Sequence, residues 1–524
     1  MSRIVFDSAR PVVESDPARN DVACFVGLAR VTGAALPAAI QKWLRVHGWA
    51  NGPLARSIDL PFTDIPIPVE SYATFTSLFD PGGSLSSVGT DYLAAAVRSF
   101  FAQGGRRCYV VRMDDPISLQ DGTAGKAQKL AALLPGDLYA VDDRRSWHGV
   151  GHLGGLPDVS FLAVPDLPAL TASAPTAAVA VVSAPISGPA QFMECAPPAT
   201  APEPIPLFNL PAPRLTPDDY ANRWAPSVQT ILGYLSKNGI RDIQFVAAFP
   251  LPQDLDAAAA AQSPSSAVLA QDVHSVITGQ MPENIPPSPS GLSTAFLQLA
   301  YPWLTTTGSN ILNESLEPPD GSLVGILARN ALTRGAFMDA TKIVPAEISD
   351  VWPSLPAREL TVPVAPLIWG GASWKPLIVR LSLFGFTPAG LRLLSDVTAY
   401  PGEAYRPARV HRLVSVISRA SRQLGERIVF QRNGPALWQT VETSLGNLLT
   451  QLWTLNALDG DTLQEAFSVR CDASTMTQND LDSGRLIAQV TFTAAATIEL
   501  IRVTLALETS GASAQGIAVM AEAS

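Results

Sequence analysis

The sequence predicts a mixed α/β protein of several domains, with an α/β core, outer insertions and a C-terminal α+β domain. Over the first two thirds of the chain, short apolar runs typical of buried strands alternate with helix-like periodicity. The last third contains two long amphipathic helices followed by alternating strands. The length of 524 residues also exceeds what one hydrophobic core usually supports.

The first core strand is expected at residues 21–29, a compact apolar run typical of a strand buried on both faces. A helix is expected from Asp91 to Gln103, where apolar residues recur at helical spacing and Gly104-Gly105 provides the stop. Further elements follow in alternation, namely strands at 106–112, 159–165 and 243–250 and a helix at 227–236. This alternation favours an α/β sheet as the core.

Two long stretches, residues 172–217 and 252–289, are rich in Pro, Ala and Ser and lack periodic pattern. They are predicted to be loops or insertions on the outer surface, and disordered linkers are the alternative. Scattered apolar residues, namely Phe192, Phe208 and Leu210, indicate that the first stretch is held down in part.

The last third is more regular. Apolar residues fall on one helical face from Val410 to Ile417 and again from Leu437 to Leu455. A turn at residues 459–461 precedes a strand at 466–472, and two more strands are expected between 485 and 507. The predicted division is an N-terminal arm at 1–20, an α/β core at 21–385, a C-terminal domain with a linking strand at 386–507, and a mobile tail at 508–524.

The composition excludes several classes of function. A formal net charge of −10 does not favour binding to nucleic-acid phosphates or to anionic lipid. The four cysteines lie far apart without a Cys-x-x-Cys pair, which predicts reduced thiols rather than a zinc site or disulfides. No secretory signal and no run of about 18 apolar residues occurs. We therefore expect synthesis in the cytoplasm, without direct insertion into a membrane.

Patterns that suggest catalysis or metal binding are weak. His148 and His152 have no third ligand at suitable spacing, so a pair of loop histidines is the favoured interpretation over a metal site or a general base. The glycine spacing at 149–154 matches a dinucleotide-binding loop but lacks the flanking strand and helix. Three acidic residues without calcium-loop spacing suit caps and turns, namely Asp472, Asp480 and Asp482. We predict no catalytic residue, metal or cofactor.

One segment carries a specific family resemblance. Residues 465–487 read Glu-Ala-Phe-Ser-Val-Arg-Cys-Asp-Ala-Ser-Thr-Met-Thr-Gln-Asn-Asp-Leu-Asp-Ser-Gly-Arg-Leu-Ile, which resembles the C-terminal signature of contractile phage tail sheath proteins. Six other segments fall in that family's order, at residues 23–27, 92–112, 301–304, 318–329, 335–337 and 405–413. The resemblance touches most of the chain outside the two Pro-rich stretches.

The resemblance implies a structural subunit that forms stacked hexameric rings around an inner tube and contracts to drive the tube through a target envelope. Extended arms exchange strands between neighbouring subunits, which satisfies unpaired backbone groups at sheet edges. The implied partners are further copies of the chain, the inner tube protein, and baseplate and terminal cap proteins, in a phage-tail-like particle that is released or docked at a membrane. Carried onto this sequence, the exchange candidates are Ile4, Val5, Phe6, Ile498, Leu500, Arg502 and Thr504.

Two further hypotheses stay open beside this one. The N-terminus departs from the Pro-Gly-Val-Tyr-Val-Glu-Glu arm common in sheath proteins, so a specialised sheath-like copy at the baseplate or cap end is an alternative. An enzyme that uses the loop of His148 and His152 is the least favoured. The helix at 406–427 is also basic, and its arginines either form a solvated face or meet the tube or a neighbouring ring, with Arg409, Arg412 and Arg419 as the candidates.

Overall fold

A computed structural model describes most of the chain. The described residues are 19–50, 58–81, 90–118, 121–136, 143–173, 211–252, 292–354, 377–428, 431–482, 485–495, 500–508 and 522–523. Several residues named above lie outside these ranges, namely the exchange candidates Ile4, Val5, Phe6 and Ile498 and the apolar residues Phe192, Phe208 and Leu210. No helix in the described ranges combines the length and the apolar character needed to cross a membrane.

The centre of the fold is a mixed sheet in which eight of the described strands follow the order β12-β11-β8-β6-β4-β1-β3-β2. Neighbouring strands from β11 to β3 run parallel, and only β12 and β2 join antiparallel at the two edges. The strands are β1 (Val22–Leu28), β2 (Pro66–Val69), β3 (Cys108–Asp114), β4 (Val159–Ala163), β6 (Gln244–Ala248), β8 (Leu297–Tyr301), β11 (Ser382–Thr387) and β12 (Gly390–Leu393). The strands expected near residues 21, 106, 159 and 243 are thereby confirmed.

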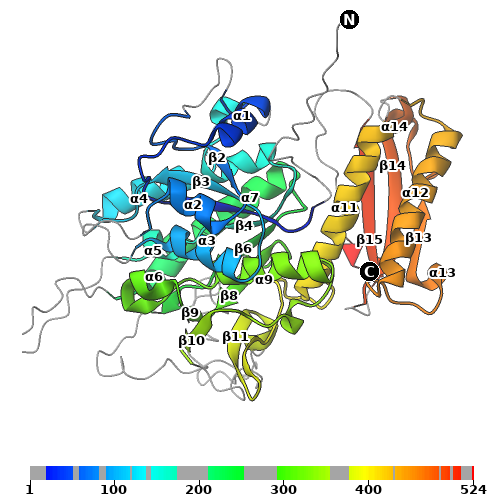
Figure 1. Ribbon diagram of the computed structural model, residues 1–524. Helices are drawn as coiled ribbons and strands as arrows, with labels where there is room; N and C mark the ends of the chain where they lie inside the picture. The colour runs from blue at the N-terminus through cyan, green and yellow to red at the C-terminus, as the bar shows by residue number, and fades with distance from the viewer. Residues whose placement is uncertain are drawn as a thin grey trace, which may run out of the picture.

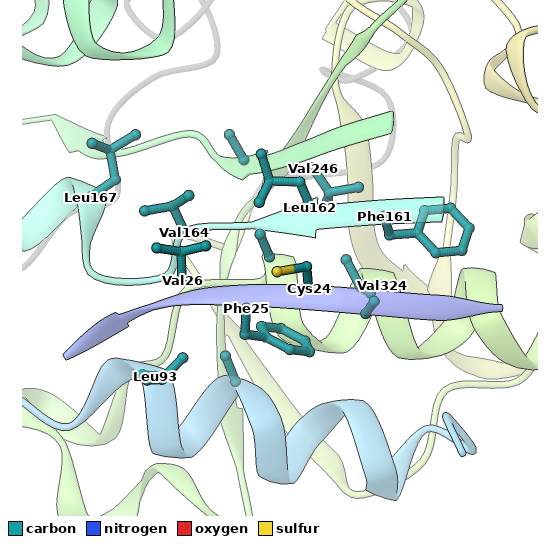
Figure 2. Packing of buried hydrophobic residues seen from close by; sticks show 14 of the residues in the cluster. Cys24, Phe25, Val26, Leu93, Phe161, Leu162, Val164, Leu167, Val246 and Val324 are labelled. Carbon is teal, nitrogen blue, oxygen red and sulfur yellow. The ribbon is translucent and has the colours of Figure 1, made fainter. Parts of the chain in front are cut away.

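Two helices, α3 (Tyr92–Ala102) and α9 (Asp320–Thr333), pack against each other and against the sheet. The contact is close because α9 presents Gly321, where a Cβ atom would lie 2.4 Å from the Cα atom of Ala96. Figure 2 shows Phe25 projecting from β1 toward α3, and its ring lies 5.5 Å from that of Phe100 in an edge-to-face arrangement. The helix α3 ends before Gly104, whose φ of +103° suits glycine, as predicted.

The remaining elements of this part fill the connections of the sheet. They are α1 (Ala38–Val46), α2 (Tyr72–Leu78), α4 (Thr123–Leu133), η2 (Arg144–Ser146), η3 (Gly149–Gly155), α5 (Leu167–Thr171), α6 (Pro217–Asp219), η4 (Tyr220–Trp224), α7 (Ala225–Lys237), β9 (Trp303–Thr306), η5 (Ser309–Ile311), η6 (Asn313–Ser315), η7 (Ala340–Lys342), β10 (Ile348–Trp352) and η8 (Leu377–Val379). Together with the eight strands they enclose one hydrophobic cluster that runs from Val22 to Ala399.

The end of the first Pro-rich stretch lies beside the start of the second. The strand β5 (Arg214–Leu215) pairs in parallel with β7 (Leu251–Pro252), which joins the end of the first stretch to the start of the second. Asp219 accepts hydrogen bonds from the backbone and hydroxyl of Ser173 and from the backbone N–H of Thr216, on both sides of residues 174–210. The placement of both stretches themselves stays a prediction, because most of their residues lie outside the described ranges.

A second hydrophobic cluster, from Ala404 to Leu505, forms the last third of the chain. Two long helices, α11 (Ala408–Ile428) and α12 (Pro435–Thr454), pack with a sheet whose four described strands have the order β13-β14-β15-β16 (Figure 1). These strands are β13 (Phe467–Arg470), β14 (Arg485–Thr493), β15 (Leu500–Glu508) and β16 (Glu522–Ala523). The short helix α13 (Leu463–Ala466) precedes β13, and α14 (Gln478–Asp482) lies between β13 and β14. Both predicted helices and all three predicted strands are present.

Most of the predicted mobile tail at 508–524 lies outside the described ranges, so it stays a prediction. Glu508 is still part of β15, and Glu522–Ala523 pairs with Ile501 and Arg502 of the same strand. The backbone groups at a sheet edge favour such pairing, because these hydrogen bonds do not depend on the side chains.

Candidate assembly site

The strand that the sequence marks for exchange lies inside the chain's own sheet. β15 pairs antiparallel with β14 over nine residue pairs, from Arg485 and Glu508 to Thr493 and Leu500. Val503 and Leu505 of β15 are fully buried in the second cluster, opposite Val490 and Ala488. The alternation of buried and partly exposed residues along β14 shows that one face of this sheet closes the chain's own core.

The exchange candidates in β15 therefore have partners within the chain. Leu500, Arg502 and Thr504 lie opposite residues 493, 491 and 489 of β14. On the other side of β15, the described pairing with β16 involves only Ile501 and Arg502. On the far side of the sheet, β13 pairs with Gln489–Phe492 alone. Short edge pairing of this kind offers backbone groups to which another strand adds.

The helix α11 joins the two hydrophobic clusters. Its apolar residues Val410, Leu413, Val414 and Ile417 belong to the second cluster. Most of its other buried residues are polar or charged, among them His411, Arg412 and Arg419. Figure 1 shows α11 at the boundary between the eight-stranded sheet and the C-terminal elements. A boundary lined with arginines rather than with leucines fixes orientation through directional contacts, since guanidinium groups bind acceptors in a defined geometry.

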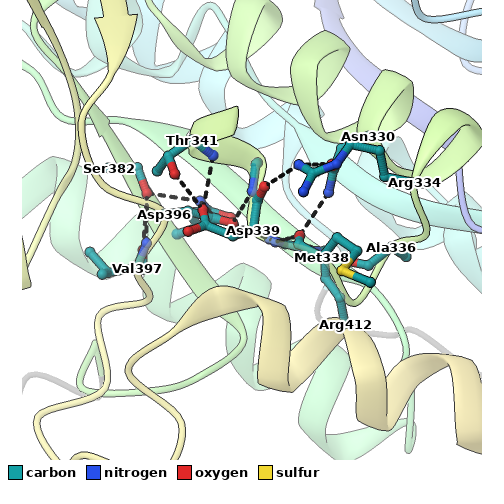
Figure 3. A network of polar contacts seen from close by, with 12 residues as sticks. Asn330, Arg334, Ala336, Met338, Asp339, Thr341, Ser382, Asp396, Val397 and Arg412 are labelled. Carbon is teal, nitrogen blue, oxygen red and sulfur yellow. Dashed lines mark hydrogen bonds and ion pairs between the residues drawn. The ribbon is translucent and has the colours of Figure 1, made fainter. Parts of the chain in front are cut away.

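Arg412 is the centre of one polar network at this boundary (Figure 3). Its guanidinium group contacts both carboxylate oxygens of Asp396, at 3.0 and 2.5 Å, and Nε donates a 2.7 Å hydrogen bond to the carbonyl oxygen of Ala336. Asp396 also accepts from Nε2 of Gln298 at 2.9 Å and from the backbone N–H of Ala340 at 3.1 Å. Burial by itself raises the pKa of Asp396, but the charge of Arg412 and these donors outweigh it and hold the pKa below its usual value.

Arg419 is the centre of a second network, two turns farther along α11. Its side chain is 2% exposed, and Nε lies 3.1 Å from Oδ2 of Asp242. The guanidinium group donates to the carbonyl oxygens of Arg19 at 2.6 Å, Asp158 at 3.1 Å and Asp242 at 3.2 Å, and also to that of Val159. Burial raises the pKa of Asp242, but the charges of Arg419 and the neighbouring Arg422 more than offset this and lower it.

These placements correct one sequence-based expectation. Arg412 and Arg419 were candidates for a helix face that meets the tube or a neighbouring ring, but both side chains are at most 4% exposed and are paired within the chain. The helical pattern located the apolar face of α11 and carried no information about what covers the opposite face. Arg409 is partly exposed, so its predicted role stays open. Asp242 and Asp396, the buried partners, were not predicted, because nothing in the local sequence pairs residues 177 and 16 positions apart.

His148 and His152 lie together on Asp64, a residue that the sequence did not single out. Nδ1 of His148 is 2.9 Å from Oδ2 of Asp64, and Nε2 of His152 is 2.7 Å from Oδ1. The backbone N–H of Gly149 donates to the same carboxylate at 3.0 Å. Asp64 thus ties η3 to the loop before β2. Within the described ranges, no group of three His, Cys, Asp or Glu residues is arranged to hold a metal ion.

A buried carboxyl group also holds α3 to its surroundings. Glu317 accepts hydrogen bonds from Oγ of Ser99 at 2.5 Å and from Oγ1 of Thr306 at 3.0 Å. Burial raises the pKa of Glu317 to about 8, against the opposing effect of these two donors, and the nearby Asp320 adds to the rise. At neutral pH the carboxyl group is therefore largely protonated, and it joins α3 to β9 as a neutral group.

The comparisons with known proteins bear on the fold. No family model and no curated protein matches the sequence. Among solved structures, a chain of the anti-feeding prophage baseplate in the contracted state matches with a TM-score of 0.55 at 18% identity, covering 94% of this chain and 93% of that one. A chain of the six-fold symmetrised baseplate of the same particle matches with a TM-score of 0.51 at 17% identity, over 94% of both chains. A chain of its helical sheath in the contracted state gives a TM-score of 0.49 at 16% identity.

The chain therefore shares its fold with chains of the anti-feeding prophage baseplate. The match extends over the eight-stranded sheet and the C-terminal elements alike, because it covers 94% of the chain. The mixed α/β architecture predicted from the sequence is confirmed, and the fold is shared with the two baseplate chains.

Proposed function

We propose that this chain is a structural sheath subunit of a contractile injection system. In this proposal it polymerises as stacked hexameric rings around an inner tube and contracts to drive the tube through a target envelope. The observation that carries the proposal is the shared fold over 94% of this chain and 93% of the matched baseplate chain. Because the similarity extends over both hydrophobic clusters, it supports a similar role for the whole chain more than the sharing of a single domain would.

Each region of the chain has a role in this proposal. The arm at residues 1–20 and the hairpin of β14 and β15 link neighbouring subunits, while residues 21–385 form the body and residues 386–507 the linking domain. The edges of the C-terminal sheet support strand addition, since β13 and β16 each pair with only part of the neighbouring strand among the described residues. The partners are further copies, the tube protein, and baseplate and cap proteins, in a particle assembled in the cytoplasm.

The test is assembly in the presence of the cognate tube protein, followed by negative-stain electron microscopy. Ribbed tubes or stacked cogwheel rings are expected for the wild-type chain. A variant that lacks residues 1–18 is expected to form no tubes, and its thermal transition, measured beside that of the wild-type chain, shows whether it folds. A wild-type chain that stays a monodisperse monomer with the tube protein present would sink the proposal.

A second candidate is a specialised sheath-like subunit at the baseplate. One observation favours it, because the two matched structures reported above with TM-scores of 0.51 and 0.55 are baseplates. A gold-labelled affinity tag at the C-terminus separates the two candidates in assembled particles. Label along the whole tube supports the sheath body, and label at one end supports the baseplate position.

A further inference from the structure

The residues just before β1, at the end of the predicted N-terminal arm, lie against α11. Arg19 is the first described residue, and its carbonyl oxygen accepts the 2.6 Å hydrogen bond from Nη1 of Arg419. The side chain of Arg19 is held as well, because its Nε donates to Oδ1 of the buried Asp21 at 2.9 Å. Both the backbone and the side chain of this residue are therefore fixed immediately before β1.

The guanidinium group of Arg419 binds backbone carbonyl oxygens at the amino-terminal ends of three strands. Besides Arg19 before β1, it binds the carbonyl oxygens of Asp158 and Val159 at the start of β4 and that of Asp242 before β6. These strands are neighbours in the sheet, in the order β6-β4-β1. A planar guanidinium group has five donors in a fixed fork, so one side chain reaches acceptors that a lysine ammonium cannot reach together.

The opposite face of α11 leads to the strand proposed for exchange. Leu413 and Ile417 of α11 lie in the same hydrophobic cluster as Val503 and Leu505 of β15. Packed side chains in a core transmit displacement, because the interior has little free volume. A continuous path thus runs from Arg19 through Arg419 and α11 to β15.

We propose that Arg419 is a mechanical joint between the N-terminal arm and the C-terminal hairpin. The joint fixes the position of Arg19 relative to β15, so that tension on the arm passes into α11 and the hairpin instead of peeling β1 from the sheet. This inference rests on the proposed function, in which both ends of the chain are linked to neighbouring subunits. Arg419 acts by positioning and touches no partner itself.

The first experiment measures the joint in the isolated full-length chain. Hydrogen–deuterium exchange with mass spectrometry compares Arg419→Lys with Arg422→Gln, a matched control because Arg422 also pairs with Asp242 but is 25% exposed. In Arg419→Lys the amides at residues 19–24 are expected to exchange about tenfold faster, because a lysine does not hold the carbonyl oxygens of all three strands. Unchanged protection at these residues overturns the proposal.

The second experiment leaves every buried side chain in place. Insertion of Gly-Gly between Arg19 and Asn20 moves the arm off Arg419, and the same insertion between Ser15 and Asp16 lengthens the arm without touching the joint. Assembly with the tube protein and then contraction are scored by electron microscopy. The first insertion is expected to abolish regular tubes or their contraction, and the second is expected to preserve both.

The outcomes separate this inference from the proposed function. If both insertions assemble and contract like the wild-type chain, the joint carries no tension and the inference is overturned while the sheath function stands. If the wild-type chain forms no tubes, the proposed function fails, and the joint as a link between assembled neighbours fails with it. If Arg419→Lys does not fold, the comparison of the two insertions decides.

Discussion

Replacement of Arg412 by methionine is expected to destabilise the fold by about 3 kcal/mol. Removing one partner of a buried ion pair costs about 3–5 kcal/mol, because the other charge stays buried and unpaired. Asp396 has a side-chain exposure of 3%, so it cannot recover by reaching water. It keeps two donors, Gln298 and the N–H of Ala340, and these place the expected cost at the lower end of the range.

The assay is urea unfolding followed by near-ultraviolet circular dichroism. Arg409→Met serves as the control on the same helix and is expected to change stability by less than about 0.5 kcal/mol, because Arg409 is partly exposed. A double-mutant cycle with Asp396→Asn is expected to give a coupling energy of about 2 kcal/mol, since the two residues share one network. Equal midpoints for Arg412→Met and Arg409→Met would refute the reasoning.

The pH dependence of the same variant provides a second check. In the wild-type chain Arg412 helps to lower the pKa of Asp396, so the stability from this pair is present above the unfolded pKa and is lost as the pH falls through the folded one. In Arg412→Met the buried carboxyl group is relieved by protonation. The stability deficit of the variant is therefore expected to shrink as the pH is lowered from 7 toward 4.

Three other changes test separate parts of the structure. The raised pKa of Glu317, about 8, means that stability is present below the unfolded pKa and is lost as the pH rises through the folded one, so the wild-type melting temperature should fall more steeply than that of Glu317→Gln between pH 5 and 8. Gly321→Val should destabilise the chain by about 1–3 kcal/mol in chemical unfolding, because its Cβ would lie 2.4 Å from the backbone of Ala96, and equal stability would contradict the close packing of α3 and α9. Asp219→Ala should speed amide exchange at residues 171–173 and 214–216 in mass spectrometry, since both sides of the first Pro-rich stretch bind this carboxylate.

The parts of the fold that follow from local pattern were predictable. The apolar run at 21–29 has no helical period, and it forms the fully buried strand β1. The helical spacing from Asp91 to Gln103 predicted α3, and the glycine pair predicted its end, because Gly104 adopts the positive φ that often follows the last turn of a helix. β2 was missed because Pro66 and Pro68 argue against a strand, and the structure explains this exception, since β2 is an antiparallel edge strand where proline is tolerated.

The joint on α11 could not be predicted for a different reason. A period of 3.6 residues shows that Val410, Leu413 and Ile417 share a face, but it does not show which distant segment covers the other side. Arginines on that side normally indicate solvent, because charged residues are rarely buried without a partner. Only the tertiary fold brings Asp242 to Arg419 and Asp396 to Arg412.

The polar character of this boundary has a mechanical consequence. A boundary of interdigitated leucines would hold the two clusters together strongly, yet it would tolerate small sliding, because dispersion contacts have little directionality. Buried ion pairs contribute little net stability relative to apolar residues of the same size, because desolvation offsets much of the attraction. Their geometry, however, is narrow, and Arg412 and Arg419 each bind acceptors from more than one segment. The boundary therefore fixes the orientation of the two clusters more than it stabilises their contact. In the proposed function this property is needed, because tension on the arm must reach β15 in a defined direction.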